Sequence, residues 1–513
     1  MTTEVELKLA LPVRSLRQAE RLPWLRQLAT APLARTKVSS VYFDTRGLKL
    51  RRHGVTLRVR GAGSKQLQTI KGDNGAGGGS PLGRFEREDE IGSQRPKLKY
   101  AKATPLAPLV TAKLKKGMHP IFRTNVQRTV LNVRLNDSDI ELAFDQGTVR
   151  AGTRAEPLHE LELELKHGSA EDLAALARRL AKDLPIAFVP QPKADRGYAL
   201  VTGKPDDHVR AAAVVLDPHQ PAGAAFQQIG LACLRHFAAN QRAVMAGDAE
   251  GIHQMRVGLR RLRAAISLFR DMLQQADVET VKKDLRWITE ELGPARDLDV
   301  LAREAIVPLR KSSPDKREIE TLERDIRRQR GAAFTRAREA VASPRFREVA
   351  LRTVLWLLDG QWRRTQGRAA DIRQRPAAAV AADILEQRSR KIIKKAKRLE
   401  ELDARRRHKL RIAAKKLRYG CEFFEGLFGH HKRQRQYRQA LKALQSELGR
   451  LNDIRVHAKT AHELTQQRGN RPHLAAQAYA MGLLIGGETQ SSRRILSAAK
   501  KAGDELADAQ SYW

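Results

Sequence analysis

Several short stretches in the first 200 residues alternate strictly between apolar and charged side chains. Near the amino terminus, Val5 and Leu7 alternate with Glu6 and Lys8, and successive side chains of a β-strand point to opposite faces. The same alternation recurs in three further stretches, at 55–60, 84–90 and 158–166. A solvated outer face would explain one such strand. Its repetition, with carboxylates and guanidinium groups on the charged faces, predicts a barrel with a polar, ion-filled lumen.

The rest of this part has the pattern of an antiparallel β protein with a few helices. We expect eight strands, at 3–10, 36–43, 55–61, 66–71, 83–91, 121–133, 139–145 and 157–166. Helices fit 13–29 and 169–183, the second with Ser169 as its N-cap. The glycine-rich segment 72–81 predicts a flexible hairpin loop, and it lacks the Gly-Lys-Ser/Thr ending of a phosphate-binding P-loop. The predicted fold of this part is an eight-stranded antiparallel β tunnel or barrel with flanking helices.

From about residue 222 the pattern changes to long amphipathic helices that contain an internal repeat. The stretch 253–263 matches 408–418, and Glu-Leu-Gly at 291–293 matches Glu-Leu-Gly at 447–449. The two blocks are separated by nearly the same distance, which indicates a duplicated helical unit. We therefore expect an α+β chain of two domains: a β domain at 1–202, a linker at 203–221, and an all-α bundle at 222–513 with repeats near 222–370 and 376–513.

The net charge of +38 over 513 residues indicates polyanionic partners. Aromatic residues are only 5% of the chain, so stacking platforms for single-stranded nucleic acid are scarce, although binding of a duplex by shape stays open. Two distant cysteines predict no disulfide framework. The sequence shows no signal-peptide h-region and no apolar run long enough for a bilayer. We expect a cytoplasmic protein without a membrane partner.

The repeated helices each carry a basic stripe that begins with a histidine. Successive residues of an α-helix are rotated by about 100° around its axis, so residues three or four positions apart lie on one face. The stripes comprise His253, Arg256, Arg260 and Arg263 in the first copy and His408, Arg411, Lys415 and Arg418 in the second. Leu259 and Leu262 lie opposite the first stripe, and Leu410 and Leu417 lie opposite the second. A single stripe would be a solvated face. Two copies facing one groove would repel each other unless a polyanion neutralised them, which favours phosphate as the ligand.

The charged faces of the predicted strands supply two sets of candidate site residues. Hard oxygen ligands suited to Mg²⁺, or alternatively Mn²⁺, are Glu4, Glu6, Glu86, Glu88, Asp145, Glu160, Glu162 and Glu164. Candidate phosphate-binding cations are Lys8, Arg58, Arg60, Lys71, Arg84, Arg123, Arg128 and Lys193. Phosphoryl transfer requires cations along the phosphates, metal ions on their oxygens and a positioned nucleophile, but little covalent help from the protein. These two sets together match a metal–polyphosphate complex in charge.

These residues also resemble a known family. Glu4-x-Glu6-x-Lys8 is similar to the signature of the CYTH domain, the triphosphate tunnel metalloenzymes, and further likeness lies in Tyr42-Phe43-Asp44-Thr45, the pairs Arg58/Arg60 and Glu86/Glu88, Lys71, Asp145-Gln146-Gly147, the strand 160–164, and Lys193 with Arg196-Gly197-Tyr198. The likeness spans nearly all of residues 3–200. The helical part, with His253 and His408 and their stripes, resembles the CHAD domain, a duplicated module that binds inorganic polyphosphate.

The resemblance implies an inorganic triphosphatase that cuts triphosphate to pyrophosphate and phosphate, with a polyphosphate-binding helical domain. It implies catalytic roles for Glu4, Glu6 and Lys8, with Glu4 and Glu6 at one metal. Glu88, Asp145 and two of Glu160, Glu162 and Glu164 would serve the other, and Glu86 could join them; which two remains open. Lys415 and Asn452 replace Arg260 and Arg296 in the second repeat, and Lys cannot form the bidentate fork of Arg. The alternatives are another triphosphate hydrolase (nucleoside or thiamine triphosphate), an adenylate cyclase, or a polyphosphate- or nucleic-acid-binding protein without activity.

Overall fold

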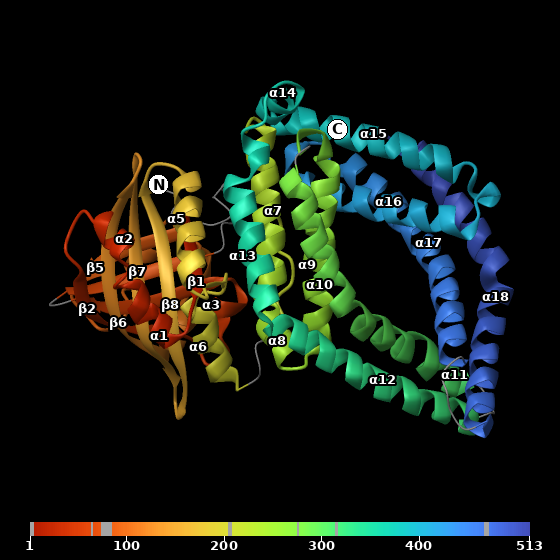
Figure 1. Cartoon of the computed structure of the whole chain (residues 1–513), viewed down its shortest axis with the longest axis horizontal. Coiled ribbons are helices and arrows are strands. Elements are labelled where there is room, and N and C mark those ends of the chain that lie inside the picture. Colours follow the sequence, from red (N-terminus) through yellow and green to blue (C-terminus); the bar gives the residue numbers. More distant parts are fainter. Residues whose placement is uncertain are drawn as a thin grey trace. The chain divides into compact units, whose positions relative to one another are not determined.

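The computed structural model describes residues 5–62, 65–72, 85–203, 208–273, 276–312, 316–465 and 471–513 (Figure 1). Glu4, Arg84 and nearly all of the segment 72–81 lie outside the described residues. The chain forms two compact units whose residues alternate along the sequence. The first comprises 1–211, 231–255 and 343–364, and the second comprises 212–230, 256–342 and 365–513. The sequence limits proposed above for the β domain, the linker and the helical domain stay a prediction.

The first unit is built on one large antiparallel sheet. Its described strands are β1 (Val5–Ala10), β2 (Ala34–Asp44), β3 (Val55–Ala62), β4 (Lys65–Gly72), β5 (Phe85–Ile91), β6 (His119–Leu135), β7 (Ser138–Ala151), β8 (Arg154–His167) and β9 (Ala187–Phe188). They pair in the order β5-β4-β3-β2-β6-β7-β8-β1-β9. The described strands therefore number nine rather than eight, and β5 and β9 are two edges instead of a closed ring. β9 was missed because two residues are too few to show a period.

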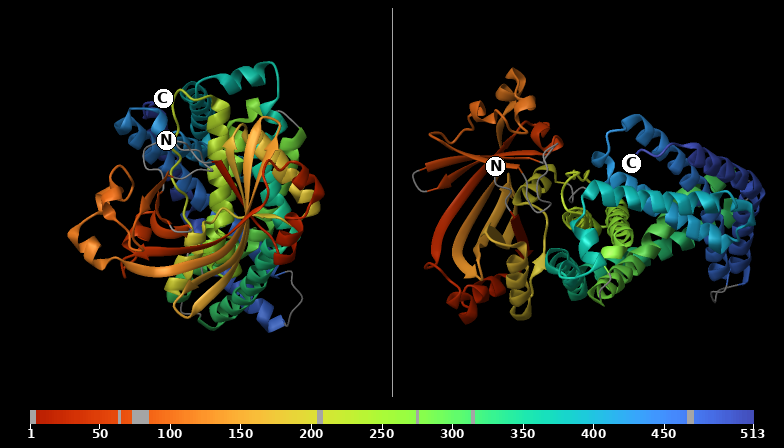
Figure 2. Two further views of the ribbon diagram at one scale, coloured as in Figure 1. Left: turned by 90° about the vertical axis from the view of Figure 1, so that its left-hand side faces the viewer. Right: turned by 90° about the horizontal axis from the view of Figure 1, so that it is seen from above.

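Alternation determines which face of each strand is buried. Leu7, Leu9, Leu161 and Leu163 are fully buried on the packed face, and the charged residues between them point the other way. A second apolar cluster around Leu50, Leu57 and Ile70 packs at the β3–β4 end of the sheet. The long strands curve (Figure 2), so that the charged faces of the strands surround a common space.

Helices of the first unit pack around this sheet. They are α1 (Val13–Ala19), α2 (Pro23–Gln27), α3 (Lys49–Arg52), α4 (Ala112–Gly117), α5 (Ala170–Asp183), α6 (Lys193–Thr202), α8 (Gln241–Met245) and α13 (Pro344–Asp359), with short 3₁₀ turns at Leu98–Ala101, Ala107–Leu109 and Gln361–Arg363. The expected helix at 13–29 is interrupted, because Pro23 cannot donate to a continuing helix and instead begins α2. The Ser169 hydroxyl accepts from the amide of Asp172, which confirms the predicted cap.

α6 approaches the sheet unusually closely at Gly197. A Cβ atom there would come within 2.2 Å of the Phe122 ring on β6, so glycine permits the contact. At the end of β2, Asp44 is fully buried and accepts from the backbone amides of Leu50 and Arg51 and from the Tyr198 hydroxyl. These contacts fix the helix that carries Lys193 and Arg196 against the sheet.

The second unit is helical. Its elements are α10 (Ala276–Val300), α11 (Val307–Ser312), α12 (Lys316–Ala342), α14 (Arg368–Gln374), α15 (Ala377–Ala396), α16 (Ala404–Phe423), α17 (His431–Thr465) and α18 (Arg471–Asp508), with 3₁₀ turns at Arg270–Met272, Leu399–Glu401 and Glu425–Leu427 and a π-helical turn at Leu301–Ile306. α7 (Ala222–Ala239) and α9 (Ala249–Leu268) contribute residues to both units. α17 runs along α18 (Figure 1).

The duplicated helices α9 and α16 bury the faces expected from the sequence. Leu259, Leu262, Leu410 and Leu417 are all fully buried. Burying such side chains is the main stabilising contribution of an amphipathic helix. The opposite faces of these two helices are therefore left for the basic stripes.

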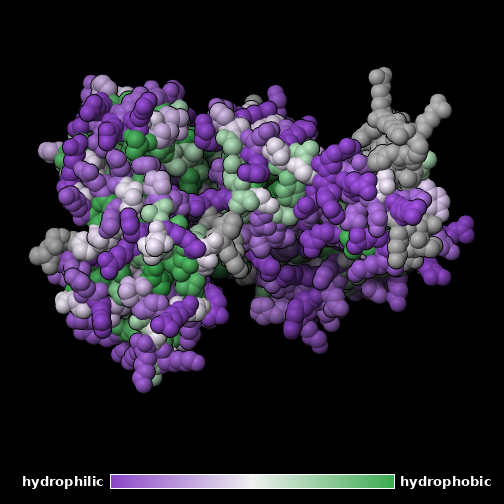
Figure 3. Space-filling model, turned by 90° about the horizontal axis from the view of Figure 1, so that it is seen from below, coloured by the Kyte–Doolittle hydropathy of each residue, from purple (hydrophilic) through white to green (hydrophobic). Residues whose placement is uncertain are grey.

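Charged and polar side chains dominate the surface face shown in Figure 3, where hydrophobic residues form only scattered patches. Cys233 and Cys421 are buried thiols. In the described part of the chain, no helix combines the length and the apolar character needed to cross a membrane.

Candidate functional site

A cavity of about 730 Å³ lies on the charged face of the sheet and is lined by every strand from β1 to β8. Its charged lining residues are Glu6, Lys8, Arg58, Arg60, Lys71, Glu86, Glu88, Arg128, Glu141, Asp145, Glu162, Glu164, Lys166, Lys193 and Arg235. Alternate residues of each strand face this space, as the side-chain period of two requires. We call it the sheet cavity.

Strand register brings charged groups together across neighbouring strands. Lys8 on β1 pairs with Glu162 on β8. On the other side of β8, Glu160 pairs with Asp145 on β7, and Asp145 in turn pairs with Arg128 on β6. Because directly opposed side chains lie close to each other, four strands place their charged groups at one end of the cavity.

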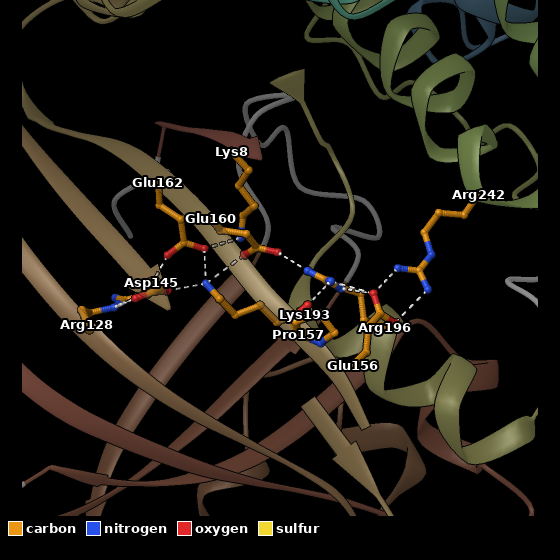
Figure 4. Close-up of polar contacts among 10 residues, drawn as sticks. All are labelled: Lys8, Arg128, Asp145, Glu156, Pro157, Glu160, Glu162, Lys193, Arg196 and Arg242. Carbon is orange, nitrogen blue, oxygen red and sulfur yellow. Dashed lines mark hydrogen bonds and ion pairs between the residues drawn. The ribbon is translucent and has the colours of Figure 1, made fainter. Parts of the chain in front are cut away.

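At that end three carboxylates surround the ammonium group of Lys193 (Figure 4). Lys193 Nζ lies 2.7 Å from Asp145 Oδ2, 2.7 Å from Glu162 Oε1 and 3.2 Å from Glu160 Oε2. Asp145 is fully buried, and Glu160 and Glu162 are only 2% and 9% exposed. Burial opposes the charge of Lys193, but Glu162, Asp145 and Glu160 outweigh it and raise its pKa. We call Asp145, Glu160 and Glu162 the acidic cluster.

Lys8 and Arg128 add two more cations to this end of the cavity. Lys8 Nζ lies 3.1 Å from Glu6 and 3.3 Å from Glu162, and Arg128 donates to Asp145 and Glu162 at 2.7 Å. Burial disfavours the charge on Lys8, yet its carboxylate partners raise its pKa, so it stays protonated. Burial alone would raise the pKa of Glu162, but Lys193, Lys8 and Arg128 hold that pKa well below its ordinary value. Glu6 is different, because burial raises its pKa despite Lys8.

The opposite wall of the cavity is formed by β3, β4 and β5. Arg60 donates to Glu88 at 2.9 Å, and Lys71 forms an ion pair of 2.5 Å with Glu86. Arg58 lies 3.8 Å from Glu86. The Nε atoms of Arg58 and Arg60 are buried without a hydrogen-bond partner among the described residues, so donors remain for an added anion.

The structure brings together most of the predicted cavity residues and separates a few. Arg123 is exposed on the outer face, because it alternates with Thr124 and Val126, which line the cavity. Glu164 lines the cavity but pairs with Lys166 at 2.6 Å, away from the Lys193 cluster. Glu160 and Glu162, not Glu164, therefore accompany Asp145.

Sequence reasoning missed several charged residues in and beside the cavity. Arg196 was named above for the family likeness but not as a site residue; it lies one turn after Lys193 on α6, a spacing that places both on one helix face and could have indicated a shared site. Glu156 continues the alternation of the predicted strand beyond its expected start. Arg235 and Arg242 carried no local signal, because their partners lie far away in the sequence.

The donor set of the acidic cluster suits a hard divalent cation. In the described part of the chain, no group of three or more His, Cys, Asp or Glu is already arranged to hold a metal ion. The reason is that Lys193 Nζ stands between the three carboxylates. Their convergence on one ammonium nitrogen shows that a cation is needed at this point. Carboxylate oxygens are ligands that Mg²⁺ and Mn²⁺ prefer, which makes these three groups candidates for holding a divalent ion.

A second candidate site lies in the helical unit, where the basic faces of α9 and α16 approach each other. Arg260 acts electrostatically on both Arg411 and Lys415. Burial, followed by Arg411, Arg260 and Arg418, lowers the pKa of Lys415 to about 8. We call Arg256, Arg260, Arg411 and Lys415 the basic cluster. Its cations repel one another, which is unfavourable unless an anion binds.

Side-chain contacts in the basic cluster leave donors for a ligand. Buried guanidinium nitrogens of Arg256 and Arg411 lack a hydrogen-bond partner among the described residues. Arg256 forms an ion pair of 3.3 Å with Asp297, an acid that is 62% exposed. Gly293, in the repeated Glu-Leu-Gly motif, faces Arg256 Nη1, which would lie 3.1 Å from an added Cβ. Glycine thus leaves room for the guanidinium.

The two repeats also differ in the surroundings of their basic stripes. His253 lies on α9 within the stretch 231–255 of the first unit, and His408 on α16 donates to or accepts from Asn452. Arg263 is exposed and lies near Arg286 and Lys416 rather than in the basic cluster. Lys416 donates to the hydroxyl of Ser267, whose counterpart in the other repeat is Glu422.

Glu422 and Ser267 occupy equivalent positions in the two repeats, but only Glu422 carries a negative charge. Glu422 lies 3.9 Å from Arg261 and 3.8 Å from Arg418. Ser267 instead accepts from Lys416 at 3.1 Å, and its carbonyl accepts from Arg388. One repeat thus carries a carboxylate at a position where the other carries a hydroxyl.

Comparison with known families gives two matches that together cover most of the chain. Residues 2–198 match the CYTH domain family, and residues 228–462 match the CHAD domain family. The crystal structure of the CHAD domain from the plant Ricinus communis is 33% identical, with a TM-score of 0.51; the match covers 59% of this chain and 99% of that one.

Among curated proteins, an inorganic triphosphatase of Haemophilus influenzae is 42% identical over 83 residues. This match covers 16% of the chain and 24% of the relative. The chain is thus matched to about a quarter of the relative's length.

Proposed function

The chain belongs to the CYTH and CHAD families, and on that premise we propose that the sheet cavity hydrolyses inorganic triphosphate to pyrophosphate and phosphate with a divalent metal ion, while the helical unit binds polyphosphate. The observation that carries the proposal is the charge pattern of the cavity. Cations line its whole length, and the acidic cluster with Asp145 lies at one end. The named relative from Haemophilus influenzae supports the choice of substrate.

Asp145, Glu160 and Glu162 would hold a divalent ion, and Glu6 lies close enough to Lys8 to border the same space. When bound, such an ion neutralises negative charge on the phosphate oxygens. Mg²⁺ fits this set of carboxylates, and Mn²⁺ is the alternative. The pKa of Glu162 is held low, so its carboxylate is ionised and ready to coordinate.

The cations of the cavity bind and align the substrate. Arg58, Arg60 and Lys71 donate to one end of the triphosphate, with the guanidinium forks suited to phosphate oxygens. Arg128 and Lys193 donate to the phosphate nearest the acidic cluster. Holding the chain straight in this way places the terminal phosphorus for in-line attack and accounts for much of the rate enhancement.

Lys8 and Glu6 divide the work on the attacking water. Lys8 is protonated, so it serves as a hydrogen-bond donor that orients the water or the leaving phosphates rather than as a base. The raised pKa of Glu6 makes it the better proton acceptor of the two. The water oxygen bonds to the terminal phosphorus, its proton passes to Glu6, and the bridging oxygen departs with pyrophosphate.

Polyphosphate is proposed for the basic cluster because its unpartnered guanidinium nitrogens need acceptors. A chain of phosphates supplies many negative charges to a set of cations that the protein's own carboxylates, Asp297 among them, neutralise only in part. Nucleic acid is the competing polyanion. Displacement of bound RNA by a low concentration of polyphosphate is the expected result, and RNA that survives a large excess would contradict it.

Phosphate release from inorganic triphosphate, ATP and long-chain polyphosphate, at equal total phosphate and with or without Mg²⁺, tests the activity. We expect rapid, metal-dependent cleavage of triphosphate alone. Cleavage of ATP in preference to triphosphate would move the proposal to an organic triphosphate. No cleavage of any of the three would leave a binding protein.

A further inference from the structure

A continuous series of ion pairs leads out of the sheet cavity to helix α8 (Figure 4). Cations and anions alternate along it in the order Lys193, Glu160, Arg196, Glu156 and Arg242. Every step is at most 3.2 Å long. We call these five residues the ion-pair series.

The inner part of the series holds a buried carboxylate. Glu160 is only 2% exposed, and its two oxygens face Lys193 and Arg196 at 3.2 Å each. A divalent ion at the acidic cluster would repel Lys193, so Arg196 would become the group that keeps Glu160 in place. A carboxylate that coordinates a metal depends on such outer partners for its orientation.

Arg196 is itself held by an acid that has a second cation. Its Nη2 donates to Glu156 at 2.6 Å and to the carbonyl of Pro157 at 2.7 Å. Glu156 also accepts two bonds from Arg242, at 2.7 and 3.0 Å, in the bidentate geometry that makes Arg–carboxylate pairs strong. Burial opposes its charge, but hydrogen bonds from Arg242 and Arg196 lower the pKa of Glu156.

Two other contacts bring the same stretch of chain to the cavity. Gln191, two residues before Lys193, donates to the carbonyl of Ala239 at the end of α7 at 2.7 Å. Arg235, one turn earlier on α7, lines the sheet cavity. Through Arg235, Ala239 and Arg242 the stretch 231–255 thus reaches the sheet cavity and the residues beside it, although it lies in the part of the sequence that matches the CHAD family.

We propose that Arg242 is a positioning residue of the sheet cavity: by fixing Glu156 and Arg196 it sets the orientation of the Glu160 carboxylate and hence the metal affinity of the acidic cluster. The inference rests on the proposed metal-dependent function of the cavity. It means that a residue of the helical sequence tunes chemistry performed on the sheet.

Arg242→Ala and Arg242→Lys test this, with Arg178→Ala as the matched control. Arg178 on α5 also joins two parts of the first unit, because it donates to Asp359 on α13 at 3.2 Å, but it has no link to the ion-pair series. The Arg242→Lys variant keeps the positive charge but cannot form the two parallel hydrogen bonds that a guanidinium makes to a carboxylate. The full chain is used throughout, and thermal unfolding of each variant is recorded.

The primary readout is Mn²⁺ binding in the presence of imidotriphosphate, a non-hydrolysable triphosphate, measured from the electron paramagnetic resonance signal of free Mn²⁺. Losing a direct outer partner of a metal ligand costs about 10- to 100-fold in affinity. Arg242 is one step further out, so we expect about 3- to 10-fold weaker Mn²⁺ binding for Arg242→Ala, a smaller loss for Arg242→Lys, and none for Arg178→Ala. In a turnover assay, kcat should fall more than KM rises.

An Arg242→Ala variant that binds Mn²⁺ as tightly as the unaltered protein would overturn the proposal. So would a loss of Mn²⁺ affinity in Arg178→Ala that equals the loss in Arg242→Ala. If the unaltered protein fails to hydrolyse triphosphate, but Arg242→Ala still weakens Mn²⁺ binding selectively, the proposed function fails and the positioning role stands. If Arg242→Ala does not fold, Arg242→Lys decides by the same Mn²⁺ comparison.

Discussion

The sheet cavity and the basic cluster contain the same kinds of cation but shift their pKa values in opposite directions. Lys8, Lys193 and Arg128 in the cavity have raised pKa values, because carboxylates outweigh their burial. In the basic cluster the pKa of Lys415 falls to about 8, because burial and neighbouring cations act together. The difference depends on whether the protein supplies its own anions.

This difference teaches how each site relates to its ligand. The cations of the cavity are neutralised by carboxylates of the protein, so the proposed metal–phosphate complex would have to enter by exchanging these ion pairs. The cations of the basic cluster are only partly neutralised by carboxylates of the protein, so the proposed polyanion would be bound mainly by charge and could vary in length. One arrangement suits chemistry at a fixed phosphorus atom, and the other suits retention of a polymer.

The largest expected effect concerns which glutamates of β8 belong to the acidic cluster. Glu162→Gln should lower metal-dependent turnover by more than about 100-fold, because it removes an ionised group from the cluster. Glu164→Gln removes the same charge from the same strand face but only its pair with Lys166, and should have little effect. Steady-state phosphate release is the measurement, with circular dichroism to confirm folding. Equal losses in both variants would show that Glu164 also serves the metal.

The next effect separates the two sites. Arg256→Ala combined with Arg411→Ala should weaken polyphosphate binding by about 100-fold, since each lost charge-assisted hydrogen bond is worth about 1.5 kcal/mol or more. Triphosphate hydrolysis should be unchanged. Arg338→Ala with Arg435→Ala, at two exposed positions, is the control of equal charge. Loss of hydrolysis in the first double variant alone would mean that the two sites act as one.

A smaller effect is a pH dependence confined to the basic cluster. Lys415 has a pKa of about 8 in the free protein, and a bound polyanion would raise it. Polyphosphate binding should therefore take up a proton near pH 8 and weaken by up to about tenfold per pH unit above it. Calorimetry in two buffers of different ionisation enthalpy measures the proton uptake.

Lys415→Arg is the companion variant, because an arginine stays charged over this range. Its polyphosphate affinity should lose the slope above pH 8. A slope that persists unchanged would assign the titration to another group. Lys8 and Lys193 in the cavity have raised pKa values and should add no break between pH 7 and 9.

The smallest effect follows from the asymmetry between the repeats. Ser267→Glu would place a carboxylate beside Lys416 and Arg388, as Glu422 stands beside Arg261 in the other repeat. We expect a stabilisation of about 0.5 kcal/mol, or a Tm about 1 to 2 °C higher. Ser446→Glu, at an exposed position of α17, is the control. An equal rise in Tm for Ser267→Glu and Ser446→Glu would show that the stabilisation does not depend on the cations beside Ser267.

Much of the sheet and its cavity could be predicted from sequence, because strand alternation is a local property. Lys8, Arg58 and Glu162 were each expected on the charged face of a strand, and in the structure all three line the sheet cavity. The same rule applied strictly would have excluded Arg123, which has the opposite parity to Thr124. The Ser169 cap was readable for the same local reason.

What could not be predicted depends on contacts between distant residues. Glu156 and Arg242 are 86 residues apart, and nothing in either neighbourhood signals the other. The choice between Glu160, Glu162 and Glu164 depended on where α6 places Lys193, which the Gly197–Phe122 contact determines. Strand closure also failed as an expectation, because pairing at sheet edges is set by tertiary packing rather than by the period.

The interleaved order of the first unit has a consequence for synthesis of the protein. The sheet is finished by residue 211, but its unit also needs 231–255 and 343–364. At a synthesis rate of about 5 to 20 residues per second, the ribosome adds residue 364 roughly 8 to 30 s after residue 211. Early in that interval Glu156 still lacks Arg242, and until nearly its end Arg178 lacks Asp359. The nascent sheet must therefore stay soluble while its cavity is incomplete, and the first helical repeat must emerge before the unit can close.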